Sequence, residues 1–294
     1  MDKTIKLLDG RTLGYTEHGD LAGYPVFFVH GNPGSRYMRH IDETIAVHQG
    51  VRIITPDRPG YGLSDYQEKR TLLDFPDDIR QLADALGIRS FSIFGVSAGG
   101  PYVAATAYRL PDRVTAAAMV SSTAPFDEIP DPYEGMNPQY VQAFKAAALP
   151  EMALRPIVAN ADKAIIKDPE AYWSAVLERA GSGDRSLLEQ QAYKKQILGY
   201  WPEATRQGSK GRVREAKILV SSWGFRLEDI QPTVHLWYWE EDQIVPVEHG
   251  RYLASRIPNS VEHFRSGGGH FGVFLAWGEI LEVLMETAQG RADG

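Results

Sequence analysis

The stretch Phe91-Ser92-Ile93-Phe94-Gly95-Val96-Ser97-Ala98-Gly99-Gly100-Pro101 carries the strongest structural signal of this chain. Its first four residues form a short apolar run, which predicts a buried β-strand. The alanine-rich segment Pro101–Arg109 predicts a helix directly after the glycines. Between strand and helix, the glycines two positions either side of Ser97 allow a sharp turn with strained backbone angles at the serine. Such a turn lifts the Ser97 hydroxyl above the sheet edge, whereas the alternative is an N-capping serine at a glycine-rich helix start.

The same alternation of strand and helix extends along the chain. Ile79–Leu86 has apolar residues at helical spacing and ends at Gly87, and a final helix is expected from about Val273 to Thr287. Asp9-Gly10 predicts the turn of an antiparallel hairpin at the start of the chain. Short apolar runs predict the strands Val26–Val29 and Val51–Ile54, and strand signals return over Thr233–Trp239 and Ser260–Phe264. Together these patterns predict an α/β fold with a mostly parallel, doubly wound sheet.

The segment after Ala124 has a different character. Several prolines interrupt it, and the following residues to about Gly211 have helical patterns without strands. We therefore expect a core of residues 1–123 and 211–294 and an inserted helical cap of residues 124–210. Because ligand pockets are largely apolar, three aromatic side chains of this segment are candidate substrate contacts, with packing inside the cap as the alternative role: Phe144, Trp173 and Trp201.

Composition excludes several classes of protein. The 294 residues include 38 Asp and Glu against 31 Lys and Arg, a net charge of −7, so no basic field favours nucleic acid. No apolar run is long enough to span a membrane. The chain has no cysteine, which excludes disulfides, thiolate metal sites and a catalytic thiol. Neither a metal nor a cofactor is expected, because the eight histidines include no His-x-x-x-His pair on a predicted helix. The first ten residues lack the apolar stretch of a secretory signal, so we expect a cytoplasmic protein; the sequence does not indicate its oligomeric state.

Two polar residues follow later strands and complete a nucleophile, acid, histidine order. Asp242 comes just after the strand Thr233–Trp239, and His270 follows Gly267-Gly268-Gly269 after the last strand. Because the carboxyl ends of parallel strands share one edge of a sheet, both are expected to meet Ser97 there. These three residues predict a catalytic triad.

An oxyanion-binding loop is predicted from His30-Gly31-Asn32-Pro33-Gly34, which follows the strand Val26–Val29. The backbone N–H of Asn32 and that of Ala98 are the expected donors to an oxyanion. His30 itself is expected to hold the loop by hydrogen bonds, and a catalytic role for His30 is the alternative.

With these motifs together, the chain resembles the α/β-hydrolase superfamily, in its form with a helical cap, from the first hairpin to the last helix. The motifs that carry the resemblance are His30–Gly34, Asp57-Arg58-Pro59-Gly60-Tyr61-Gly62-Leu63-Ser64, Gly95–Gly99, Trp223-Gly224-Phe225 with Asp229-Ile230, Asp242-x-x-Val245-Pro246 and Gly269-His270-Phe271. Some members of the family carry the acid after the preceding strand, which makes Asp127 or Glu128 the alternative to Asp242.

Two positions depart from the family's patterns. Trp239 stands where relatives usually have glycine, which leaves open whether its ring disturbs the acid loop or walls the pocket. Ser97 occupies the position at which relatives that open epoxides or displace halide carry aspartate, and this argues against both activities.

The residues and the resemblance predict a serine hydrolase that cleaves a carboxylic ester of a small, largely apolar substrate through an acyl-enzyme, with a thioester or lactone as variants. Ser97 would attack, His270 would take its proton, and Asp242 would orient the imidazole. Three alternatives with the same triad stay open: carbon–carbon bond hydrolysis, acyl transfer, and ligand sensing by a receptor of this fold.

Overall fold

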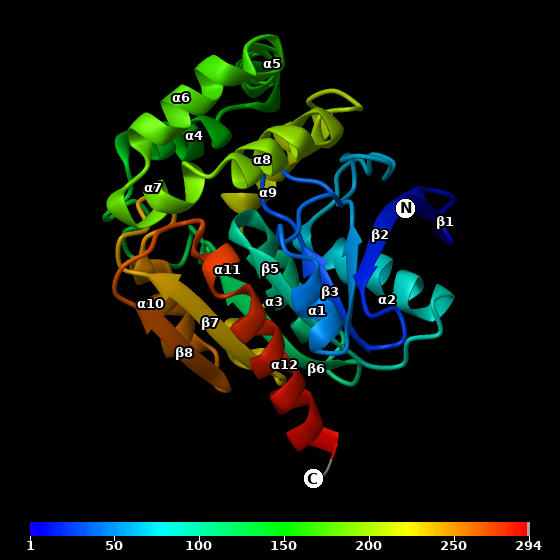
Figure 1. Cartoon of the computed structure of the whole chain (residues 1–294). Coiled ribbons are helices and arrows are strands. Elements are labelled where there is room, and N and C mark those ends of the chain that lie inside the picture. Colours follow the sequence, from blue (N-terminus) through cyan, green and yellow to red (C-terminus); the bar gives the residue numbers. More distant parts are fainter. Residues whose placement is uncertain (293–294) are drawn as a thin grey trace.

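The computed structural model describes residues 1–292, which form an eight-stranded sheet with helices on both faces (Figure 1). The strands are β1 Lys3–Lys6, β2 Thr12–Gly19, β3 Tyr24–Val29, β4 Val51–Pro56, β5 Phe91–Val96, β6 Val114–Val120, β7 Thr233–Trp239 and β8 Ser260–Arg265. Their order across the sheet is β1-β2-β4-β3-β5-β6-β7-β8. Strand β2 runs antiparallel to β1 and β4, and the other neighbouring pairs are parallel. The predicted α/β class, mostly parallel sheet and opening hairpin are confirmed.

Alternating side chains of the strands build two cores, one on each face of the sheet. Phe27 and Val29 of β3 belong to the core shared with α2, α3 and α10, whereas Val26 and Phe28 belong to the core shared with α1 and α12. The helices of these layers are α1 Thr44–His48, α2 Phe75–Ala85, α3 Gly100–Arg109, α10 Val247–Arg256, α11 Gly272–Leu275 and α12 Trp277–Ala292. Burial on both faces explains why the central strands are continuous apolar runs.

Six helices, here called the cap helices, lie between β6 and β7 in the chain: α4 Pro138–Ala147, α5 Glu151–Lys167, α6 Pro169–Arg179, α7 Ser182–Leu188, α8 Gln191–Ala204 and α9 Lys210–Leu219. They gather in a layer at one end of the sheet (Figure 1). Asn137 and Asp168 cap α4 and α6 with their side-chain oxygens. The helical stretch reaches Leu219, past residue 210, and the division into core and cap domains stays a prediction. None of the helices within residues 1–292 is both long and apolar enough to cross a bilayer.

Two elements differ from the expectation. Strand β6, where no strand is predicted, lies inside the sheet between β5 and β7 although its Ala116-Ala117-Ala118 sequence has little strand preference. The final helix predicted from about Val273 to Thr287 is present, but it is divided into α11 and α12 by a break at Ala276. The break brings the Trp277 ring against Phe28 and Phe94 of the sheet, with ring centroids 5.0 and 5.1 Å apart.

Candidate active site

Ser97 lies at the turn between β5 and α3. Its φ of 54° is in the left-handed region, and a single 3-10 turn, Ser97–Gly99, leads into α3. Gly99 is required by a close approach, since a Cβ at this position would lie 2.2 Å from the carbonyl oxygen of Val29. The Ser97 side chain is partly exposed while its neighbours on both sides are buried. The strained turn that the glycine spacing predicts is present, with the serine at its accessible tip.

Asp242 and His270 form a hydrogen-bonded pair. The Asp242 Oδ2 atom accepts a hydrogen bond from His270 Nδ1 at 2.9 Å, and Oδ1 accepts the backbone N–H groups of Ile244 at 2.8 Å and Val245 at 2.9 Å. Asp242 is only 3% exposed. A proton on Nδ1 leaves Nε2 of the neutral imidazole as an acceptor, which is the form that a general base needs.

The surroundings of His270 favour its protonated form. Burial disfavours the imidazolium, but the carboxylate of Asp242, through its charge and hydrogen bond, and the charge of Asp184 outweigh burial and raise the pKa of His270 above its ordinary value. The two carboxylates therefore stabilise the positive charge that develops when the imidazole accepts a proton.

The predicted oxyanion loop lies beside the serine, because a Cβ on Gly31 would be 3.5 Å from the Cβ of Ser97. Arg58 donates a hydrogen bond from Nη2 to the carbonyl oxygen of Gly31 at 2.9 Å. That carbonyl and the N–H of Asn32 belong to one trans peptide group and point in opposite directions. By holding the carbonyl, Arg58 fixes the direction of the Asn32 N–H.

A second side chain acts in the same way on the other predicted donor. The Ser122 hydroxyl donates to the carbonyl oxygen of Ser97 at 3.1 Å, and this carbonyl shares its peptide group with the N–H of Ala98. Both peptide groups that carry the predicted donors are thus held from their carbonyl side.

His30 is buried below this loop. Its Nδ1 donates to the carbonyl oxygen of Gly31 at 2.9 Å, and its Nε2 accepts the backbone N–H of Arg58 at 3.2 Å. Burial lowers the pKa of His30 well below its ordinary value, so the imidazole is neutral. These bonds occupy both ring nitrogens and fit the loop-holding role.

Arg58 is anchored by a buried ion cluster. Glu215 of the cap helix α9 accepts hydrogen bonds from Arg58, from Arg70 at 2.7 Å and from the Tyr102 hydroxyl at 2.7 Å. Burial opposes ionisation of Glu215, but the two guanidinium groups outweigh it and lower the pKa of Glu215. The loop that carries Asn32 is therefore connected through Arg58 to a cap helix.

Comparison with known proteins identifies the family. A sequence model described as alpha/beta hydrolase fold matches residues 24–155. The non-heme chloroperoxidase of Streptomyces lividans is 33% identical over 267 residues, which cover 88% of this chain and 87% of that protein. The chain belongs to the α/β-hydrolase superfamily.

Further relatives of this α/β-hydrolase carry other activities in their names. A 2-hydroxy-6-oxo-6-phenylhexa-2,4-dienoate hydrolase of Burkholderia cepacia is 27% identical over 264 residues, 85% of this chain and 82% of that protein. The structure of an esterase from Exiguobacterium antarcticum has the same fold, with a TM-score of 0.70 and 16% identity over 98% of this chain and 100% of that one. The family and the relatives named as hydrolases support hydrolase activity.

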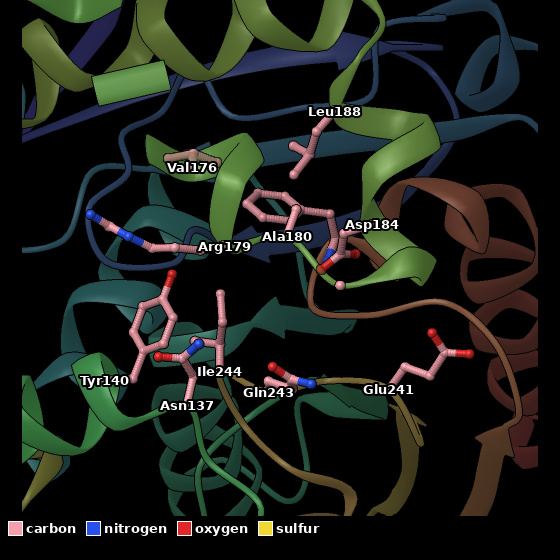
Figure 2. A pocket seen from close by; sticks show the side chains of 12 residues that line it. Asn137, Tyr140, Val176, Arg179, Ala180, Asp184, Leu188, Glu241, Gln243 and Ile244 are labelled. Atoms are coloured by element: carbon pink, nitrogen blue, oxygen red, sulfur yellow. The ribbon is translucent and has the colours of Figure 1, made fainter. Parts of the chain in front are cut away.

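A small pocket of about 30 Å³ lies between the cap helices and the acid loop of this α/β-hydrolase. Its lining includes Tyr140, Arg179 and Asp184 from the cap helices, and Ile244 and Phe271 next to Asp242 and His270. Figure 2 shows Tyr140 extending toward Arg179 on one side of the pocket, with Asp184 on the other.

The three aromatic candidates for substrate contact do not line this pocket. Phe144 packs on Phe126 with ring centroids 4.8 Å apart, Trp201 packs on Tyr172 at 4.9 Å, and Trp173 is buried among the cap helices. Their contact with substrate stays a prediction. Within residues 1–292, no three His, Cys, Asp or Glu side chains converge to hold a metal ion.

Trp239 packs under the histidine loop. Its ring is 3% exposed, and a Cβ on Gly268 or Gly272 would lie 2.5 or 2.3 Å from the indole. Gly268 and Gly272, on either side of His270 in the chain, therefore leave space for the Trp239 ring. The Asp242–His270 hydrogen bond is formed with this ring in place.

Sequence reasoning missed four side chains around the site: Arg58, Ser122, Asp184 and Glu215. Arg58 lies in the Asp57–Ser64 motif, directly after the apolar strand β4 and before Gly60. A charged residue at such a position could have been recognised as a candidate for a buried contact. The other three have no local pattern that distinguishes them from exposed polar residues, because their contacts come from distant segments.

Proposed function

We propose that this α/β-hydrolase is a serine esterase that cleaves a small, largely apolar carboxylic ester through an acyl-enzyme. The observation that carries the proposal is the 2.9 Å hydrogen bond between His270 Nδ1 and the buried carboxylate of Asp242, which leaves Nε2 as a base. The strained, partly exposed Ser97 at the carboxyl end of β5 supports the role of nucleophile.

In the proposed reaction, Ser97 Oγ attacks the ester carbonyl while His270 Nε2 takes the hydroxyl proton. The N–H groups of Asn32 and Ala98 bind the oxyanion of the tetrahedral intermediate. The bond to the alcohol oxygen then breaks, and His270 gives its proton to the leaving alkoxide. Water, deprotonated by His270, hydrolyses the acyl-enzyme and restores the serine.

The nucleophile is tested with p-nitrophenyl esters of increasing acyl length and with a fluorophosphonate that labels activated serines. Ser97→Ala should lower kcat at least about 10³-fold and abolish labelling, since the triad acts as a unit. Activity and labelling that persist in this variant would overturn the proposal. The preferred acyl length measures the space available to the acyl group.

The acid is tested by comparing Asp242 with the two carboxylates of the alternative position. Asp242→Ala should lower kcat strongly, because the imidazole loses its orienting partner, whereas Asp127→Ala and Glu128→Ala should behave like the wild type. The reverse result would assign the acid to the alternative position.

A carbon–carbon bond hydrolase is the second candidate, supported by the 27% identity to the dienoate hydrolase of Burkholderia cepacia. A folded wild type that labels with fluorophosphonate, leaves p-nitrophenyl esters intact and hydrolyses a vinylogous diketone would favour it. Acyl transfer would appear as a new ester product when an alcohol acceptor is added. Ligand-dependent binding without turnover would indicate a receptor.

A further inference from the structure

Asp184, on the cap helix α7, contacts the backbone of the histidine loop. Its Oδ2 accepts the N–H of His270 at 2.9 Å and its Oδ1 accepts the N–H of Phe271 at 2.9 Å. The side chain is buried, with 8% of the residue exposed. One carboxylate thus holds the backbone of the proposed catalytic base and of the next residue.

Two glycines bring the helix and the loop into backbone contact. A Cβ on Gly183 would lie 2.3 Å from the carbonyl carbon of Gly268, and a Cβ on Gly269 would lie 2.4 Å from Asp184 Oδ2. Any larger residue at either position would push α7 away from the loop. The approach of α7 to the histidine loop is therefore close enough to transmit a displacement of one to the other.

The same region of the cap also contacts the acid loop. Ser182, one residue before Gly183, donates a hydrogen bond to the carboxylate of Glu241, the neighbour of Asp242. The backbone N–H of Asn137, which caps α4, donates to the carbonyl oxygen of Gln243 at 2.8 Å. Both loops of the Asp242–His270 pair are thus attached to the cap helices.

We propose that Asp184 is a positioning residue: its carboxylate aligns the His270 imidazole through the loop backbone, so that catalysis depends on the docking of α7. This inference rests on the proposed function, because it assigns His270 as the base. The titratable groups that interact with Asp184 are His270, Asp242 and Tyr140. Arg179 and Glu241 line the same pocket.

The ionised form of Asp184 is the form that holds the loop. A carboxylate offers acceptors on both oxygens, whereas an amide or a protonated carboxyl presents a donor on one side and cannot accept both N–H groups equally. Burial raises the pKa of Asp184 to about 6, so the carboxylate is ionised near neutral pH and becomes protonated in mild acid. Asp184→Asn reproduces the neutral side chain without changing its volume.

The experiment compares Asp184→Asn with Glu189→Gln, a matched loss of charge at the exposed end of α7, where Glu189 pairs with Arg185. We expect Asp184→Asn to lower kcat for a p-nitrophenyl ester and the rate of fluorophosphonate labelling by about 10- to 100-fold, with KM changed less than about twofold. Backbone amide exchange of His270 and Phe271 should become faster. Glu189→Gln should match the wild type in each measurement.

Gly183→Ala gives a second test that leaves every charge in place. The added Cβ displaces α7 from Gly268, so kcat should fall and amide exchange at His270 should accelerate as in Asp184→Asn. Unchanged kcat and exchange in both variants, or a lower melting temperature with unchanged kcat, would overturn the positioning role. If wild type and Ser97→Ala label equally poorly, the proposed function fails instead, while amide exchange still tests whether Asp184 holds the loop.

Discussion

Replacing Glu215 by alanine removes the counter-ion of two buried arginines. The Glu215 carboxylate is fully buried and accepts hydrogen bonds from Arg58, Arg70 and the Tyr102 hydroxyl. Both guanidinium groups are themselves at most 1% exposed, so water cannot replace the lost partner without opening the site. The variant is therefore expected to unfold more easily than the wild type.

The magnitude follows from the burial of all partners. Breaking a buried ion pair by removing one partner costs about 3–5 kcal/mol, because the remaining charge stays desolvated. Since about 1 kcal/mol shifts the melting temperature of a large domain by about 2–4 °C, the expected decrease is roughly 6–20 °C. The melting temperature of Glu215→Gln should lie between those of the wild type and Glu215→Ala, because the amide oxygen still accepts a hydrogen bond but carries no charge.

Urea unfolding followed by circular dichroism measures the change in the free energy of unfolding. Glu151→Ala is the matched control, because it removes a carboxylate from an exposed pair with Arg155 in the cap helix α5. This control should unfold close to the wild type. If Glu215→Ala is no less stable than Glu151→Ala, the reasoning from buried charge is refuted.

Two further outcomes are expected. The kcat/KM for a chromogenic ester should fall as the pH drops through the pKa of His270. Burial lowers this pKa, but the carboxylates of Asp242 and Asp184 outweigh burial and raise it above its ordinary value. A pH profile in which kcat/KM falls only below about pH 6 would contradict His270 as the base. Gly267→Ala, at a φ of 72° with no atom within 4 Å of the added Cβ, should lose only about 1–2 kcal/mol in urea unfolding. Gly268→Ala, at a φ of 89°, should lose about 1–3 kcal/mol more, because its Cβ would lie 2.5 Å from the Trp239 ring; equal losses would exclude that contact.

The features predicted from sequence are those with a local physical cause. The strands β3, β4 and β5 are short apolar runs because both faces of the sheet are covered, and each is found within two residues of its predicted ends. The turn at Ser97 could be predicted because the glycines two positions either side of the serine, between an apolar run and a helical segment, form a local pattern. The contact that requires Gly99, with the carbonyl oxygen of Val29, lies in a distant segment and could not be predicted. Asp242 and His270 could be placed near each other because parallel strands end at one edge of the sheet.

Two features that depend on packing against distant segments were not predicted. Strand β6 has an alanine-rich sequence that suits the narrow space between α3 and α12, although alanine itself favours helix. The break between α11 and α12 depends on where the Trp277 ring meets the sheet. In both cases packing against distant segments overrides local preference.

The cap helices contribute more to this site than one wall of the pocket beside it. Helix α7 supplies Asp184 to the backbone of the histidine loop, and helix α9 supplies Glu215 to Arg58, which holds the carbonyl of Gly31. Each buried carboxylate thus reaches one of the two loops on which the proposed proton transfer and oxyanion binding depend. Asp184 and Glu215 are distinguished from exposed acids only by their partners, which lie more than 80 residues away in the chain. No local sequence pattern could therefore have identified these two carboxylates. The helices between β6 and β7 thus provide two buried carboxylates that hold, directly or through Arg58, the loops that carry His270 and Asn32.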